Sequence, residues 1–361
     1  MRIDTKRADE ELSVGLVGFG LGGAVFHAPL IEATRGLKLT AVVTADPGRV
    51  RQVELQYPKA KVFDSAGRLW ERSAEFDLVV VTTPNRTHVP LALAALGAGL
   101  HVVVDKPLAA TAADASRLVE EADVRGLLLT PFHNRRWDGD FLTVRRLLER
   151  GGLGRVVRFE SRFERWRPRP KPGWRQSAEP GDAGGLLYDL GSHLIDQVLL
   201  LFGPARSVYA ELNPFYEGAE ADNDSFVALA HEGGVRSHLW MSTAAAQAGP
   251  RFRVLGSEAA YTKFGLDVQE EALKQGGRPG GAGWGEEEES CWGLLGAGDE
   301  QRPLRTEPGS YQRFYEEVFA AIREGTPPPV EPSDAVAVLE VIEAARRSHA
   351  EGQTVTLKAE S

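Results

Sequence analysis

A glycine-rich turn near the N-terminus restricts the fold of this chain more than any other feature. The turn, Gly18-Phe19-Gly20-Leu21-Gly22-Gly23, follows an apolar run at 13–18 and opens a segment with helical periodicity at 22–33. In such a strand–turn–helix unit, Gly18 permits the tight turn, Gly20 lets the backbone approach a pyrophosphate, and Gly23 allows close helix–strand packing. The helix N-terminus offers unpaired N–H groups to phosphate. The turn therefore predicts a dinucleotide-binding unit.

Strands and helices continue to alternate after this turn. Short apolar runs at 39–43, 76–81, 101–104 and 126–130 predict further buried strands, and the segments 89–97 and 111–125 predict helices between them. Buried apolar runs separated by helices are typical of a parallel sheet covered on both faces. The pattern predicts an α/β fold, with a doubly wound Rossmann domain over residues 1–133.

The second part of the chain, residues 134–361, has a different pattern of apolar and polar residues. Helices are expected at 141–150 and 186–202, and alternating or short apolar runs at 155–167, 226–231, 235–241 and 251–255 predict strands of a largely antiparallel sheet. The glycine- and glutamate-rich stretch 275–309 is expected to be a surface loop. Two C-terminal helices, within about 311–350, are expected to pack back on the Rossmann domain. We interpret 134–361 as an α+β substrate and oligomerisation domain, which forms a homodimer or homotetramer through an open-faced sheet.

Composition excludes several classes of protein. A length of 361 residues favours two domains, and a net charge of −9 argues against general nucleic-acid binding. The single cysteine, Cys291, cannot form an internal disulfide, which favours the cytoplasm. The N-terminal MRIDTKRADEEL lacks the apolar core of a signal peptide, and no apolar run approaches the ~20 residues that span a bilayer. The expected partner is a small molecule rather than nucleic acid or membrane.

The end of the second strand indicates which cofactor is bound. NAD enzymes place an acidic residue there to accept a hydrogen bond from the ribose 2′-hydroxyl. Here the strand ends at Thr44, and the first acidic residue is Asp46, two positions later. Thr44 leaves room for a 2′-phosphate, and Arg49 is near enough in sequence to pair with it. The sequence favours NADP, with NAD still open if Asp46 turns inward.

Three residues are candidates for proton transfer. Lys106 follows a predicted parallel strand, at the edge where open α/β sheets bind ligands. Asp189 and His193 are spaced i, i+4 on a predicted helix, so the carboxylate can orient the imidazole; Asp196 is an alternative orienting group. Hydride transfer to an alcohol needs no metal here, and the spacing is not that of a zinc motif, so no metal site is expected.

Other polar residues lie near these candidates in sequence. Asn85 and His88 follow a predicted strand and can contact the nicotinamide half of a cofactor, although His88 can equally start a helix. The segment 155–175 is strongly basic and contains Trp166, Pro168 and Trp174. A solvated basic face is its expected role, with a substrate mouth or a subunit contact as the alternatives.

Taken together, these motifs resemble the glucose–fructose oxidoreductase/inositol dehydrogenase/MocA (Gfo/Idh/MocA) family from end to end. The matching segments are the glycine turn, Pro84-Asn85-x-x-His88, Asp105-Lys106-Pro107, Asp189-Leu190-Gly191-Ser192-His193 and the stretch 321–328. Asp105 stands where the family usually has glutamate. The motifs Phe26-His27-Ala28-Pro29-Leu30-Ile31 and Phe132-His133-Asn134-Arg135-Arg136-Trp137-Asp138 are similar to those of the NADP-dependent scyllo-inositol dehydrogenases. The resemblance implies a cyclic polyol or sugar substrate.

The motifs and the resemblance together define the expected site. The expected catalytic residues are Lys106, Asp189 and His193. Substrate is expected to bind Asn134, Arg165, Asp189 and His193. The cofactor is expected to bind Gly18, Phe19, Gly20, Leu21, Gly23, Thr44, Arg49, Thr83, Pro84, Asn85, His88, Asp105 and Lys106.

Two other functions remain open at this point. One is a cofactor-sensing regulatory protein on the same fold, although family members of that kind tend to lose the active-site lysine or histidine, which this chain keeps. The other is a reductase of unsaturated or imine substrates, of the biliverdin or dihydrodiol type. Such an enzyme would depend little on Lys106.

Overall fold

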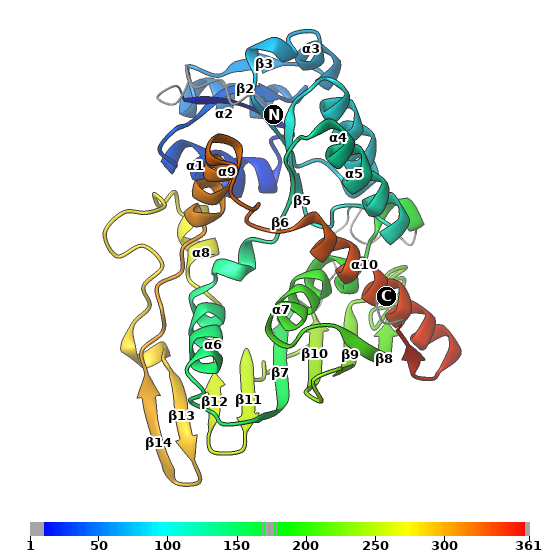
Figure 1. Ribbon diagram of the computed structural model, residues 1–361, viewed down its shortest axis with the longest axis vertical. Helices are drawn as coiled ribbons and strands as arrows, with labels where there is room; N and C mark the ends of the chain where they lie inside the picture. Colours follow the sequence, from blue (N-terminus) through cyan, green and yellow to red (C-terminus); the bar gives the residue numbers. More distant parts are fainter. Residues whose placement is uncertain (1–10, 168, 170–172, 174–176, 178, 358–361) are drawn as a thin grey trace.

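The computed structural model describes residues 11–357 apart from 168, 170–172, 174–176 and 178, and contains two β-sheets (Figure 1). The N-terminal segment and, in the basic segment, Pro168 and Trp174 therefore lie outside the described residues. The first sheet has six parallel strands in the order β3-β2-β1-β4-β5-β6. Its strands are β1 (Leu12–Val17), β2 (Leu37–Val43), β3 (Lys61–Phe63), β4 (Leu78–Val81), β5 (His101–Asp105) and β6 (Leu129–Phe132). The order confirms the doubly wound parallel sheet.

Helices cover both faces of this sheet because its strands are apolar on both sides. In β4, Val79 and Val81 belong to the core that contains α4 (His88–Gly97) and α5 (Ala112–Arg125). Leu78 and Val80 belong to the core that contains α1 (Ala28–Ala33) and α9 (Gln312–Glu324). Alternate residues of a strand point to opposite faces, so this uninterrupted apolar run supplies two cores.

The predicted boundaries agree with most of these elements, with two differences. The last strand begins at Leu129 rather than at 126, because Gly126 ends α5 in the left-handed conformation at φ 63°. The helices α2 (Pro47–Gln56) and α3 (Ala66–Trp70) and the three-residue strand β3 were not predicted. They carry few buried residues, and therefore little apolar periodicity to detect.

The second sheet is mixed but largely antiparallel, in the order β14-β13-β12-β11-β7-β10-β9-β8-β15. Only the pair of β7 (Val156–Glu164) and β10 (Arg236–Ser242) is parallel among its described pairings. The other strands are β8 (Ala205–Asn213), β9 (Asp224–His231), β11 (Phe252–Gly256), β12 (Ala260–Lys263), β13 (Gly293–Ala297), β14 (Glu300–Leu304) and β15 (Val355–Thr356). The expected loop at 275–309 is partly wrong, because β13 and β14 extend the sheet as a projecting hairpin (Figure 1).

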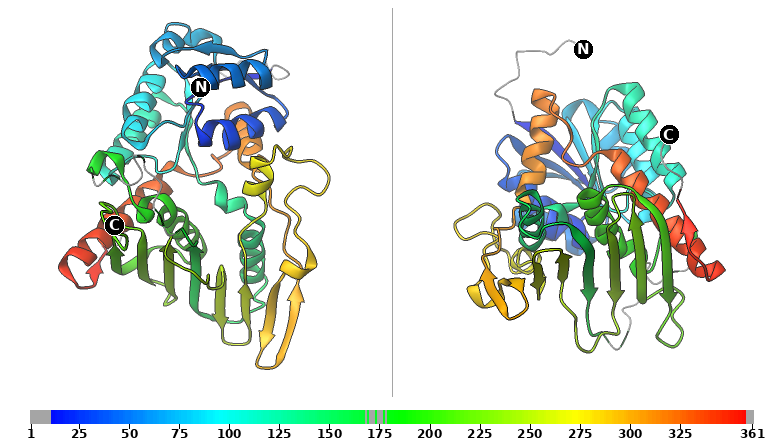
Figure 2. Two further views of the ribbon diagram at one scale, coloured as in Figure 1. Left: turned by 180° about the vertical axis from the view of Figure 1, so that it is seen from behind. Right: turned by 60° about the horizontal axis from the view of Figure 1, so that its bottom comes forward.

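Helices lie on one face of this sheet. They are α6 (Gly139–Glu149) and α7 (Ser192–Phe202), and a π-helical turn, Leu187–Gly191, precedes α7. No helix of the described residues covers the opposite face (Figure 2). The short α8 (Gln269–Lys274) connects the sheet to the region of the glycine turn. None of the described helices is long and apolar enough to cross a membrane.

The C-terminal helices return to the first sheet. The side chains of Phe314 and Tyr315 from α9 are fully buried in the core formed with β1 and α1. The last long helix, α10 (Pro332–Glu351), contacts both α5 and β8 (Figure 1). Glu343 accepts a hydrogen bond from the Ala112 amide at 2.8 Å, and Ser348 accepts one from the Ala210 amide at 3.1 Å. This helix therefore bridges the two sheets.

Candidate active site

A cleft of about 610 Å³ lies where the carboxyl ends of β5 and β6 meet the second sheet. Its lining contains Lys106, Asp189 and His193 together with two predicted substrate-binding residues, Asn134 and Arg165. Leu21 and Gly22 of the glycine turn and Asp105 also line it. The carboxyl ends of parallel strands are where open α/β sheets place their ligands. The structure thus brings together residues that are up to 253 positions apart, from Leu21 to Lys274.

Three of the four glycines in the turn have the geometry that a dinucleotide requires. Gly18 has a φ of 103°, and a Cβ on it would lie 2.5 Å from the Thr82 carbonyl oxygen. A Cβ on Gly23 would lie 2.3 Å from the Gly18 carbonyl oxygen, so helix and strand are in close contact. A Cβ on Gly20 would meet no atom within 4 Å among the described residues, which leaves the approach to its backbone open. The turn fits a bound pyrophosphate.

The end of β2 differs from that of a typical NAD site. Thr44 is buried at this end, with its amide bonded to the Phe63 carbonyl at 2.9 Å. Asp46 begins α2, and its carboxylate accepts the Arg49 amide at 2.9 Å. This N-cap lowers the pKa of Asp46 through the hydrogen bond from the Arg49 backbone. The carboxylate nearest in sequence to Thr44 is therefore engaged in capping a helix, while Arg49 is exposed.

The ammonium of Lys106 is held by Asp189. It lies 2.5 Å from the Asp189 carbonyl oxygen and 2.9 Å from Oδ1. Lys106 directly follows β5, and its own amide donates to Oδ1 of Asp105 at 2.9 Å. The side chain of Lys106 is 14% exposed and that of Asp189 32%, so both can reach a molecule in the cleft. The predicted partner of Asp189 was His193, whereas these contacts orient Lys106.

His193 is the second titratable group of the cleft, in the first turn of α7. Burial lowers its pKa well below the ordinary value, and the nearby charges of Lys106 and Arg135 lower it further. Its Nδ1 atom is buried and has no hydrogen-bond partner among the described residues. The imidazole is therefore neutral near pH 7 and able to accept a proton.

Asp196 has a different role from the orienting one considered above. Its carboxylate accepts hydrogen bonds from the Arg136 guanidinium, at 2.9 Å from Nε and 2.5 Å from Nη2. It also lies 3.9 Å from Nδ1 of His133. Arg136 in addition contacts Asp334 of α10 at 2.8 Å. This cluster ties α7 to α10.

Asn85 and His88 lie behind the cleft rather than in its lining. The amide of Asn85 donates to the carbonyl oxygens of Asp182, at 3.0 Å, and Ala183, at 3.4 Å. The ring nitrogens of His88 lie 2.9 Å from the Pro107 carbonyl oxygen and 2.8 Å from that of Thr83. His88 is the first residue of α4, in agreement with the alternative that it starts a helix. His88 therefore links the segments that follow β4 and β5, and Asn85 holds the turn at 180–183. Thr83 and Pro84, also expected to bind cofactor, are likewise not in the lining.

Several residues of the cleft were not predicted as site residues. Glu270 accepts a hydrogen bond from Arg135 at 2.5 Å and from Lys274 at 2.7 Å. Although burial alone raises the pKa of Glu270, these cations bring it down to about 2. Other unpredicted lining residues are Gly185, Leu186, Asn223 and Thr243. The Gly184-Gly185 pair ahead of the Asp189 helix was a sequence signal for Gly185 and Leu186. Asn223 and Thr243 had no such signal, because they adjoin β9 and β10, which are distant in the chain.

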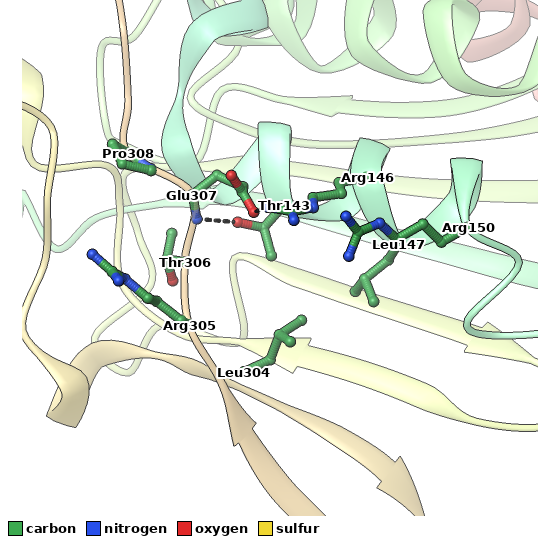
Figure 3. Close-up of a pocket in the computed structure, with 9 residues that line it drawn as sticks. All are labelled: Thr143, Arg146, Leu147, Arg150, Leu304, Arg305, Thr306, Glu307 and Pro308. Carbon is green, nitrogen blue, oxygen red and sulfur yellow. Dashed lines mark hydrogen bonds and ion pairs between the residues drawn. The ribbon is translucent and has the colours of Figure 1, made fainter.

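A second cavity, of about 480 Å³, lies beside the C-terminal half of α6 (Figure 3). There the Thr143 hydroxyl accepts the Glu307 amide at 2.8 Å, and Arg146 forms an ion pair with Glu307. None of the residues predicted to bind cofactor or substrate lines this cavity. The cleft at Lys106 is therefore the candidate active site.

His27, just after the glycine turn, links stability to pH. Its Nδ1 lies 2.6 Å from the Tyr315 hydroxyl, and its Nε2 lies 3.9 Å from the Asp105 carboxylate. Burial lowers its pKa to about 4. Because an unfolded histidine titrates near ~6.5, the unfolded chain binds this proton more tightly. The stability linked to His27 is full above pH 6.5 and is lost as the pH falls towards 4.

We expect urea unfolding of the wild type to lose up to about 3 kcal/mol through His27 over this interval. His27→Gln cannot take up a proton, so its free energy of unfolding should fall less between pH 7 and pH 4.5. The difference between the two proteins isolates His27 from the other buried histidines. Identical pH dependence in both would contradict the prediction.

Comparison with known proteins agrees with this architecture. Residues 12–133 match the model of the GFO_IDH_MocA oxidoreductase family, NAD-binding Rossmann fold, and residues 145–357 match that of its C-terminal alpha/beta domain. A scyllo-inositol 2-dehydrogenase (NADP+) of Bacillus subtilis is 35% identical over 357 residues, which are 98% of each chain. An oxidoreductase of Escherichia coli is 40% identical over 336 residues, 92% of this chain and 95% of the relative.

Solved structures agree as well. An oxidoreductase of Yersinia pestis superposes with a TM-score of 0.90 at 39% identity, covering 98% of this chain and 99% of that one. The matches extend over both sheets and over all the motifs of the cleft. The chain is therefore an oxidoreductase of the glucose–fructose oxidoreductase/inositol dehydrogenase/MocA family.

Proposed function

We propose that this oxidoreductase uses NADP in preference to NAD and oxidises a carbinol carbon of a cyclic polyol or sugar, or reduces the corresponding ketone. The observation that carries the proposal is the placement of Lys106, Asp189 and His193 in one cleft beside the glycine turn. When bound, the nicotinamide accepts or supplies the hydride. The relative from Bacillus subtilis is named for NADP+ and scyllo-inositol, which supports both parts of the proposal.

The protein side of the reaction concerns the hydroxyl proton. His193, neutral near pH 7, accepts the proton as the alcohol becomes a carbonyl. The Lys106 ammonium donates a hydrogen bond to the same oxygen and stabilises the negative charge that develops there. Asp189 holds Lys106 in position through the contact at 2.9 Å. In the reverse direction, the protonated His193 returns the proton.

The preference for NADP follows from the end of β2. Because the Asp46 carboxylate caps α2, the ribose 2′ position of a bound cofactor would meet the neutral Thr44 rather than an acidic residue. The exposed Arg49 is close enough in the chain to pair with a 2′-phosphate. We expect Arg49→Ala to raise the KM for NADP about tenfold and to change the KM for NAD little.

A substrate panel tests the proposal. Purified protein is mixed with cyclic polyols, aldoses and their ketones, with NAD or NADP, and the absorbance of the reduced nicotinamide is followed. Turnover of at least one polyol or sugar, with a higher kcat/KM for NADP, is the expected result. A preference for NAD would overturn the interpretation of Thr44. Binding of cofactor without turnover of any member would instead favour a regulatory protein.

We also propose that two copies of the chain associate through the uncovered face of the second sheet. This face carries the aromatic pair Phe226 and Trp240, with ring centroids 5.1 Å apart, and the Arg162 guanidinium lies 3.9 Å from the Trp240 ring. Arginines and glutamates alternate on it, as in the Arg158–Glu160 ion pair at 3.0 Å. Because the face carries both positive and negative side chains, it can pair with the same face of a second copy. Light scattering is expected to give at least twice the chain mass of 39.3 kDa; a monomeric mass would refute the association.

A further inference from the structure

The cleft is cationic although the chain is acidic. Of the described residues that line it, six are lysines or arginines and three are acidic, whereas the whole chain has a net charge of −9. The six are Lys106, Arg135, Arg165, Arg167, Arg169 and Lys274, and the three are Asp105, Asp189 and Glu270. The neutral hydroxyls of a polyol do not require such an excess of positive charge.

The three carboxylates are already engaged with part of this charge. Asp189 contacts Lys106, and Asp105 accepts hydrogen bonds from the Lys106 amide and the Thr82 hydroxyl. Glu270 alone faces three cations, Arg135 at 2.5 Å, Lys274 at 2.7 Å and Arg165 at 3.9 Å. Within the described part of the chain, neither Arg167 nor Arg169 forms an ion pair with an acidic side chain. The surplus positive charge therefore lies where Arg167 and Arg169 line the cleft.

The backbone that carries these arginines is anchored. Beyond the end of β7, the Arg165 amide donates to the Ser242 carbonyl at 2.8 Å and the Arg167 amide donates to the Thr243 carbonyl at 2.9 Å. Trp166 forms a bridge with Ala244 between them. In extended backbone, residues two apart point to the same side, so Arg165 and Arg167 face the cleft together. Burial lowers the pKa of Arg165, and the charges of Arg167 and Arg135 act in the same direction against Glu270.

The 2′-phosphate of NADP does not account for this charge. Thr44 directly follows β2. In the sheet order, β2 is separated by β1 and β4 from β5, which precedes Lys106. At ~4.8 Å between neighbouring strands, the two ends are about 14 Å apart. Arg165 and Arg167 follow β7 of the second sheet, and they line the cleft with Asn223 and Thr243 as well as with the glycine turn. Their position suits the substrate rather than the adenosine ribose.

We propose that the substrate bears an anionic group, a carboxylate or a phosphate, that binds Arg165 and Arg167 while a separate carbinol carbon reacts at Lys106 and His193. The inference rests on the proposed function and narrows its substrate class to acidic sugars or polyols. The reaction balances as before: the carbinol C–H bond breaks with hydride going to the nicotinamide, the O–H proton goes to His193, and a C=O bond forms. The anionic group is unchanged, and guanidinium groups bind both kinds of anion through paired hydrogen bonds.

Matched substrates test this inference. Glucose is compared with glucuronate and glucose phosphate, and inositol with inositol phosphate, each with NADP. We expect kcat/KM for an anionic member to exceed that of its neutral partner about 10- to 100-fold, and added salt to reduce the ratio. The uronate and phosphate arms identify which anion is preferred. In R167A and R165A the ratio of anionic to neutral kcat/KM should fall towards one, whereas the control R302A, on the exposed strand β14, should keep it.

Each alternative result separates the inference from the function on which it rests. Equal kcat/KM for neutral and anionic partners in the wild type would overturn the inference and leave the proposed function intact. A higher KM of R167A for NADP, with an unchanged substrate ratio, would assign Arg167 to the cofactor and also overturn it. If no member is turned over, calorimetric titration of the NADP-loaded protein with glucuronate and glucose phosphate decides. Binding that R167A abolishes supports the anion site, and the absence of binding refutes it.

Discussion

Lys106→Ala is expected to lower kcat about 100- to 10,000-fold, the range of loss typical of a group that interacts with a transferred proton or with the developing charge. The reason is the position of its ammonium, 2.9 Å from Asp189 at the end of β5 and within the lining of the cleft. The measurement is the absorbance of the reduced nicotinamide at saturating cofactor. Lys106→Met, which keeps most of the apolar stem, should show a similar loss.

A lysine outside the site provides the control. Lys38, on β2, is 46% exposed and pairs with Glu11 at 3.8 Å, so Lys38→Ala should retain wild-type kcat. Cofactor affinity, followed by fluorescence, should be nearly the same in the wild type and in all three variants if Lys106 acts mainly on the substrate. Near-wild-type turnover by Lys106→Ala would instead support reduction of an unsaturated or imine substrate, for which a proton at this position matters less.

Arg136→Ala should produce the largest loss of stability, about 3–5 kcal/mol in the free energy of unfolding. Arg136 is 9% exposed and holds the Asp196 carboxylate, which is 2% exposed, at 2.5 Å. Removing the guanidinium leaves that carboxylate charged and without its partner in a buried setting. Urea unfolding at neutral pH measures the effect.

Two further variants establish its cause. The double change R136M/D196L removes both charges and should recover much of the loss, because a buried ion pair can be replaced by apolar side chains of similar volume. Arg145→Ala, which breaks an exposed pair with Glu149 on α6, should leave the unfolding midpoint almost unchanged. If the double variant were as unstable as Arg136→Ala, the loss would have to come from packing rather than from an uncompensated charge.

Local patterns were sufficient to predict much of the first sheet. The strand at 78–81 is a continuous apolar run, and the helix at 112–125 has an N-cap at Thr111 and a C-terminal glycine, so both can be recognised within a short window. The hairpin of β13 and β14 could not be recognised in this way. Four of the five residues of β14 are exposed, so this strand has no apolar alternation and depends on pairing with β13.

The candidate site was only partly predictable for a similar reason. Lys106 and Asp189 were each identified, but their contact joins residues 83 positions apart, which no local pattern encodes. Arg135 and Arg136 are neighbours in sequence, yet the first binds Glu270 and the second binds Asp196. The i, i+4 spacing suggested that Asp189 orients His193, whereas the structure directs Asp189 to a lysine of the other sheet. Long-range partners decide the role of a polar residue.

The bridging helix α10 has a consequence for motion. It is bonded to α5 through Glu343 and to β8 through Ser348, and Arg136 ties it to α7 through Asp334. The two lobes are the parts of the chain built around the first and the second sheet. A hinge between them needs a short connection at which few contacts break. Here a helix of 20 residues spans both lobes and would have to bend or detach. We therefore expect the lobes to move as one body, so that substrate enters a cleft whose shape is already set and loses little binding energy to closure.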